Sequence, residues 1–171
     1  MLLQIIAHTP KWVFALFAAL LGLGLNQLLT RRLGLSRIAL LAAGMAAFSF
    51  YGTVSAFAAV PTALFAWLAG AAVVALIVIN RPVPSGTRFD AASRHFTVPG
   101  SVVPLALMMG IFFTKYAVGV TLGMHLVQAN DVSFALAVSA LYGAFSGVFA
   151  GGAARLWRLA LAQDRLQLAA A

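Results

Sequence analysis

The chain contains the run ALFAWLAGAAVVALIVIN between Ala63 and Asn80, which carries no charged residue and decides the fold class. A helix needs about twenty mostly apolar residues to cross the hydrocarbon core of a bilayer. Only Val60, Pro61 and Thr62 separate this run from a second apolar run at residues 38–59. So short a connection predicts that the two runs form a tight antiparallel pair of membrane-spanning helices.

The same pattern continues on both sides of this pair. Three more apolar runs lie between short polar gaps, at residues 12–29, 104–126 and 132–154. Together the five runs use nearly all of the 171 residues, so residues 1–171 are expected to form a single transmembrane domain. The predicted fold is an all-α integral membrane protein, a bundle of five transmembrane helices.

The composition favours the same class of protein. Hydrophobic residues make up 63% of the chain and charged residues 8%, against roughly 25% charged in soluble domains. The absence of cysteine excludes disulfides, thiol catalysis and thiolate metal sites. A net charge of +8 is also found in nucleic-acid-binding proteins, but here the basic residues lie between apolar runs. The expected partners are therefore anionic lipid head groups, and no nucleic acid.

The arginines occupy every second gap. All nine follow the first run, the third run or the fifth run, whereas Lys11 alone lies on the other side. Because cytoplasmic loops carry an excess of Lys and Arg, this distribution predicts an N-terminus outside and a C-terminus in the cytoplasm. An odd number of spans requires the two ends to lie on opposite sides, which agrees with the charge distribution.

The longest gap, 81–103, alternates apolar and polar residues on either side of 90–93. This alternation predicts a small cytoplasmic β-hairpin on the membrane surface. Phe89, Phe96 and Val98 would lie toward lipid or helix ends, and Arg88 and Arg94 near phosphates. An irregular loop fits equally well, because an isolated two-stranded hairpin is marginally stable. Beyond the fifth run, the arginine- and leucine-containing tail indicates an amphipathic extension of the last helix at the interface.

Lys115 is the residue of greatest functional interest, because it lies near the centre of the fourth run. At 1.5 Å per residue it is roughly 16 Å from the cytoplasmic end of that span. A lysine at this depth costs about 2.5–3.5 kcal/mol on insertion scales and usually faces the interior of a bundle. We therefore expect a buried lysine in this protein.

Polar side chains of the second and fifth runs are expected at the depth of Lys115. They are Ser49, Tyr51, Thr53, Ser139 and Tyr142. Asp131 is expected too far toward the outer face to pair with the lysine. The cluster is either a structural hydrogen-bond network or a site at which Lys115 binds an anion or relays a proton.

Small residues recur at every fourth position of the fifth run, forming a small-residue ridge of Ala135, Ser139, Gly143, Gly147 and Gly151. Such a ridge lets two helix backbones approach closely. An intramolecular partner is favoured, with Gly119 and Gly123 of the fourth run or alanines of the second run as neighbours. A second copy of the chain or another membrane protein stays open as the partner.

Motifs of known enzymes are missing from the sequence. It has no paired carboxylates, no His-Glu metal motif, no glycine-rich phosphate loop and no Gly-x-Ser-x-Gly. His8 and His125 lack the close spacing of metal ligands. The sequence therefore predicts a protein that is not an enzyme and that has no cofactor and no metal site.

Two segments carry a resemblance to known proteins: RFDAASRHFTVPGS at 88–101 and VPLALMMGIFFTKY at 103–116. They resemble a family of small, uncharacterised proteobacterial inner-membrane proteins, over most of the chain. The chain is more loosely similar to small membrane proteins associated with cytochrome c biogenesis, without a motif that carries a cytochrome role. The resemblance implies a multi-pass protein of the bacterial inner membrane and no particular activity.

Two functions from different classes follow from these observations. The first is a non-enzymatic accessory or structural membrane protein. The alternative is a small permease or channel in which a buried Lys115 binds an anionic solute or relays a proton.

Overall fold

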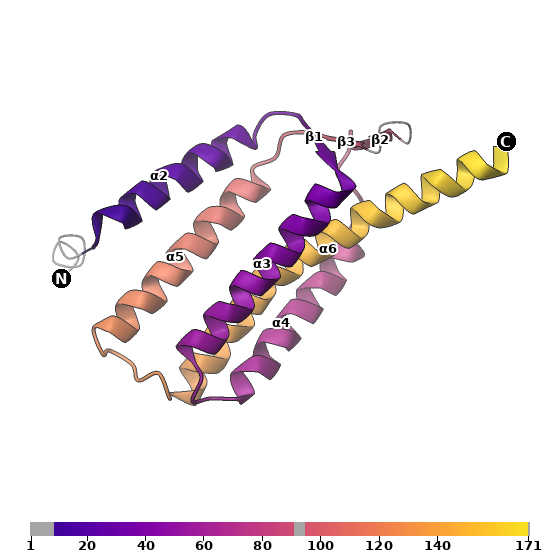
Figure 1. Ribbon diagram of the computed structural model, residues 1–171. Coiled ribbons are helices and arrows are strands. Elements are labelled where there is room, and N and C mark those ends of the chain that lie inside the picture. The colour runs from indigo at the N-terminus through magenta and orange to yellow at the C-terminus, as the bar shows by residue number, and fades with distance from the viewer. Residues whose placement is uncertain (1–8, 91–94, 171) are drawn as a thin grey trace. The chain divides into compact units, whose positions relative to one another are not determined.

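The computed structural model describes residues 9–90 and 95–170 (Figure 1). His8 and Arg94 lie outside the described residues. The elements are, in chain order, α2 (Lys11–Asn26), β1 (Arg31–Gly34), α3 (Leu35–Ala56), α4 (Thr62–Ile79), β2 (Arg88–Asp90), β3 (His95–Val98), α5 (Val103–Gly123) and α6 (Val132–Ala170). They belong to two compact units, residues 1–30 with 100–128 and residues 31–99 with 129–171.

Four helices, α3, α4, α5 and α6, are long and apolar enough to cross a membrane. These lengths indicate a multi-pass helical membrane protein. The fifth helix, α2, has 16 residues and is about 24 Å long, shorter than the roughly 30 Å hydrocarbon core. It ends at Asn26, three residues before the end of the predicted first span, where the Gln27 N–H turns back to the carbonyl of Gly24.

The smaller unit is an antiparallel pair of helices, α2 and α5. The backbone N–H of Val103 donates to Ser101 Oγ, and α5 begins there, with Pro104 in its first turn. Three contacts show the direction of the pair, because residue numbers rise along α2 while they fall along α5. Thr9 Oγ1, just before α2, lies 2.6 Å from Tyr116 Oη. The rings of Phe17 and Phe112 are 5.3 Å apart between centroids, and Gly24 packs against Leu105.

The larger unit contains α3, α4 and α6. Ser49 of α3 contacts Trp67 of α4 and Tyr142 of α6, while Phe57, at the end of α3, packs its ring against Phe134 near the start of α6. Residue numbers that rise along α3 therefore fall along α6, so these two helices are antiparallel. Since α4 is parallel to α6, α3 is antiparallel to α4 as well. Asp131 Oδ1 accepts the Phe134 N–H and caps the start of α6.

The helices α4 and α6 run parallel to each other in close backbone contact. Gly143 faces the carbonyl of Trp67, Gly147 faces that of Ala71, and Gly151 faces that of Ala75. Three glycines of the small-residue ridge therefore pack on α4. The sequence had favoured the second or fourth run as the partner; a Cβ on Gly119 or Gly123 would meet no atom within 4 Å.

The three strands form one antiparallel sheet in the order β1-β3-β2. The two segments of the expected hairpin, β2 and β3, pair as antiparallel strands, and residues 91–94 between them lie outside the described residues. β1 adds a third strand that the sequence did not suggest. The sheet contacts α3 through β1 and α6 through β2, so it lies at the end of the larger unit away from the α3–α4 connection (Figure 1).

The helix α6 is longer than the predicted span of 132–154. Its 39 residues give a length of about 58 Å. Arg155 Nη1 donates to the carbonyl of Pro82 at 2.9 Å, which ties α6 to the segment that follows α4. Figure 1 shows the C-terminal part of α6 extending past the ends of α3 and α4. The amphipathic tail is thus a direct continuation of the last spanning helix.

Candidate functional site

One hydroxyl group joins the three helices of the larger unit. Ser49 is buried on α3, where its Oγ accepts a hydrogen bond from Trp67 Nε1 of α4 at 2.9 Å. The same hydroxyl donates to the carbonyl oxygen of Tyr142 of α6 at 2.8 Å. Because no water is available in a bilayer interior, such bonds contribute to helix association there.

Two more buried hydroxyls extend this arrangement. Ser146 Oγ donates to the carbonyl of Tyr142, and Thr53 Oγ1 donates to the carbonyl of Ser49, each at 3.3 Å. We call Ser49, Thr53, Trp67, Tyr142 and Ser146 the hydroxyl network. Its members satisfy one another and the helix backbone, which is how polar groups are accommodated in an apolar interior.

Ser139 lies in the same interior but is not hydrogen-bonded to the network through its hydroxyl. Its residue is 0% exposed, and its Oγ has no hydrogen-bond partner among the described residues. It belongs to the small-residue ridge of α6, four residues before Gly143. At this position the small volume of serine suits close packing, and the hydroxyl adds no bond.

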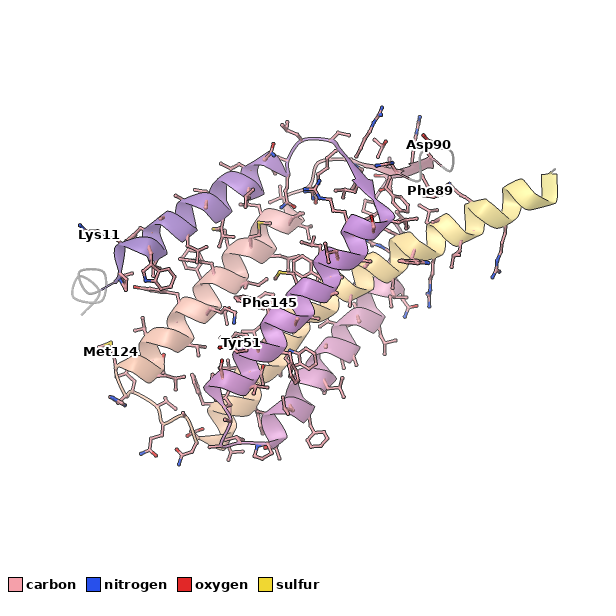
Figure 2. All side chains as sticks on the ribbon, viewed as in Figure 1. Lys11, Tyr51, Phe89, Asp90, Met124 and Phe145 are labelled. Carbon is pink, nitrogen blue, oxygen red and sulfur yellow. The ribbon has the colours of Figure 1, made fainter. Side chains whose placement is uncertain are left out.

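The structure thus brings Ser49, Thr53, Ser139 and Tyr142 into one interior, and it leaves Tyr51 out. Tyr51 is 70% exposed, because it lies two residues from Ser49 on the far side of α3 (Figure 2). Trp67 of α4 also contributes to this interior, although it was not among the residues expected at this depth. The sequence signal for its role is the indole N–H, because a buried indole in an apolar helix needs a hydrogen-bond acceptor.

Lys115 lies on α5 in the smaller unit, whereas the hydroxyl network belongs to the larger unit. The expectation of a buried lysine is wrong, because Lys115 is half-buried. Within its unit, α5 contacts α2 through one row of side chains, and Lys115 lies beside this row, which consists of Leu105, Met108, Phe112 and Tyr116. Val118 is the buried residue of α5.

A double-mutant cycle tests the Ser49–Trp67 hydrogen bond. Ser49→Ala leaves the indole N–H of Trp67 without its acceptor, and Trp67→Phe removes the donor. We expect each variant to lower the free energy of unfolding in detergent, with a coupling of about 0.6–1.7 kcal/mol between them. Ser55→Ala, at an exposed position on the same helix, should change it by less than about 0.5 kcal/mol. Strict additivity would show that the bond does not stabilise the unit.

The arginines of the larger unit gather at one end. Because α3 is antiparallel to α4 and α6, its start lies beside the end of α4, and α6 continues past this level. The arginines at or beyond this end are Arg31, Arg32, Arg37, Arg81, Arg88, Arg155, Arg158 and Arg165. Residues 57–61 and 129–131 at the opposite end, all of them described, include no basic residue.

Two of these cations lie close together. Burial, and next the positive charge of Arg37, lower the pKa of the Arg31 guanidinium from its ordinary value. A positive charge in the first turn of α3 is also unfavourable toward the helix dipole, and α3 has no acidic residue in that turn. This end of the unit therefore has a strongly positive potential, which favours anionic partners.

Comparisons with known proteins place the chain in a family without assigning an activity. Neither a curated protein nor a solved structure matches it. A model described as a family of unknown function (DUF6622) matches residues 1–168. This match confirms the expectation of an uncharacterised family, and it spans nearly the whole chain. The protein is a member of the DUF6622 family of unknown function.

Proposed function

We propose that this protein is a non-enzymatic accessory or structural protein of a bacterial inner membrane, in which the α3–α4–α6 unit is a tightly packed scaffold. The observation that carries the proposal is the hydroxyl network. Its hydrogen bonds run between helices and back to helix carbonyls, so its polar groups are used for packing. The glycine contacts between α4 and α6 support the same role.

We also propose that the arginine-rich end faces the cytoplasm, with the N-terminus outside and the C-terminus inside, and that both units form a single transmembrane domain. The support is the gathering of arginines at one end of the larger unit. Anionic lipid head groups are the expected partners at that end. The proteobacterial origin and the looser similarity to proteins of cytochrome c biogenesis stay expectations of the resemblance.

Single cysteines test this orientation, because the natural chain has none. Ser85 and Asn130 are both exposed, and they lie at opposite ends of the larger unit. We expect an impermeant maleimide added to intact cells to label Asn130→Cys and to leave Ser85→Cys unlabelled. The reverse pattern would place the arginine-rich end outside and contradict the proposed orientation.

The alternative function is a small permease or channel that uses Lys115. One observation favours it: Lys115 is a half-buried cation in the middle of a helix long and apolar enough to span the membrane. Such residues often mark ion or solute pathways. The hydroxyl network carries the scaffold proposal more directly, because the hydrogen bonds among its members lie within one unit.

Anion flux separates the two functions. We expect proteoliposomes that contain the wild-type protein to release nitrate or chloride no faster than empty vesicles, and we expect Lys115→Met to behave in the same way. Lys115→Arg, which keeps the charge, is the matched control. A saturable flux in the wild type that Lys115→Met abolishes and Lys115→Arg retains would replace the scaffold function with the permease.

A further inference from the structure

The three-stranded sheet has two chemically different faces. Residues paired across antiparallel strands project to the same face, and successive residues alternate between faces. Leu33, Phe96 and Phe89 are paired in one row and form an apolar face. Phe96 is 0% exposed, and its ring lies 4.7 Å from that of Phe89 between centroids. Figure 2 labels Phe89 at the sheet, which contacts α3 through β1 and α6 through β2.

The next row of the sheet projects to the opposite face and carries two arginines. Arg32 of β1 and Arg88 of β2 both pair with Thr97 of the central strand β3. Both arginines are exposed, and neither guanidinium group has a hydrogen-bond or ion-pair partner in the described part of the chain. We call Arg32, Thr97 and Arg88 the Arg-Thr-Arg row.

The spacing of this row suits one phosphate group. Neighbouring strands lie about 4.8 Å apart, so the two arginine Cα atoms are about 10 Å apart with Thr97 between them. Two flexible guanidinium groups can converge from the two sides onto an anion above the Thr97 hydroxyl. Each guanidinium binds phosphate oxygens in a bidentate manner, and the hydroxyl supplies a further donor.

The rest of this polar face leaves the row positive. The following row pairs Asp90 with His95, and Gly34 occupies the third position. Asp90 and His95 each make another interaction of their own. This face therefore carries one carboxylate and two guanidinium groups. The surplus positive charge favours an anion that carries no ammonium group.

The position of the row in the chain points to a lipid as the source of the phosphate. β1 passes directly into α3 at Gly34 and Leu35, and α3 is one of the span-length helices. Arg32 precedes the start of α3 by about 10 Å at 3.3 Å per residue. The head-group layer adds roughly 5–7 Å to each side of the hydrocarbon core. Long arginine side chains at this level reach the lipid phosphates.

We propose that the Arg-Thr-Arg row binds the phosphate of an anionic phospholipid in the cytoplasmic leaflet. This inference rests on the proposed orientation, and it adds a defined binding site to a general attraction between basic residues and lipid. The two guanidinium groups hold the phosphate, and the Thr97 hydroxyl donates to it from below. The ammonium of phosphatidylethanolamine or the choline group of phosphatidylcholine adds a positive charge that the arginines disfavour.

The test is lipid-dependent stabilisation of the purified protein in a neutral detergent. Phosphatidylglycerol is titrated against the wild type, and the thermal midpoint gives an apparent affinity. We expect phosphatidylglycerol to raise the midpoint in a saturable manner, and Arg32→Gln with Arg88→Gln to weaken the apparent affinity by about tenfold for each arginine removed. Arg158→Gln with Arg165→Gln removes two exposed arginines of α6 and should leave it within about twofold.

Several other outcomes of this titration would overturn the proposal. Equal stabilisation by phosphatidylcholine, or equal loss in the α6 control, would overturn a defined anionic-lipid site. Stabilisation by inorganic phosphate without an effect of phosphatidylglycerol would assign the row to a soluble phosphate compound. If the double Gln variant does not fold, Arg32→Lys with Arg88→Lys keeps both charges and loses the bidentate fork. That variant should bind several-fold more weakly, and an unchanged affinity would overturn the arrangement.

The orientation fails separately from the site. Maleimide labelling of Ser85→Cys from outside the cell would refute the cytoplasmic placement while leaving the lipid titration in detergent unchanged. Loss of the lipid effect with normal labelling would refute the site and retain the orientation.

Discussion

Gly143→Ala lowers the stability of the larger unit by about 3 kcal/mol, the upper end of the range for overpacked interiors. A single added methyl group would overlap the carbonyl oxygen of Trp67 and would lie 2.8 Å from its carbonyl carbon. Both atoms belong to the backbone of α4, so neither moves without shifting that helix. Thermal unfolding in a mild detergent measures the effect, and the yield of folded protein should fall with it.

Gly152→Ala is the matched control for this prediction. Gly152 lies on the same helix, and a Cβ there would meet no atom within 4 Å. Because alanine is the better helix former by about 1 kcal/mol, this variant should be neutral or more stable than the wild type. If Gly143→Ala is as stable as Gly152→Ala, the two helices do not pack through this glycine, and the parallel α4–α6 contact is wrong.

Phe96→Ala is expected to cost about 3–5 kcal/mol, as large-to-small changes at fully buried phenylalanines do. Phe96 is among the largest fully buried side chains of the described chain and lies on the central strand of the sheet. Its loss removes the packing of both edge strands at once. Hydrogen exchange should therefore accelerate first at residues 31–34 and 95–98, while the amides of α4 stay protected.

Phe65→Ala is the control for that change, because Phe65 is 73% exposed on α4. It removes the same side chain from a position without a packed environment. The free energy of unfolding in detergent should fall by less than about 1 kcal/mol. Equal losses at the two positions would mean that the apolar face of the sheet is not packed against the unit.

Much of the architecture could be predicted because its signals are local. Each apolar run reports its own helix, and the alternation around residues 90–93 reports the two strands β2 and β3. The partner of a helix is a different matter. The small-residue ridge shows that α6 has a close neighbour, but its periodicity describes α6 alone. That α4 fills this place follows from the geometry of three helices.

The elements that were missed depend on distant parts of the chain. β1 consists of Arg31, Arg32, Leu33 and Gly34, a composition with little strand preference, and it pairs with residues 95–98 more than sixty positions away. The exposure of Lys115 depends on which face of α5 meets α2, and the sequence of α5 alone does not show that face. The rise per residue predicts how far along their helices Ser49, Ser139 and Tyr142 lie. It does not predict the rotation of α3 about its axis, which turns Tyr51 away from the interior. A ligand or proton role for these residues stays a prediction.

The pairing of helices also determines the order in which their contacts can form during synthesis at the ribosome. The contact of α2 with α5 cannot form until α5 has been translated. The contact of α4 with α6, which involves the backbone of Ala71 and Ala75, likewise forms only after α6 is made. Until then the surface of α4 that packs on α6 has no partner from the later part of the chain. Release of a nascent chain before α6 would therefore leave the glycine-matched surface of α4 open, an unfinished state that a membrane quality-control protease could recognise.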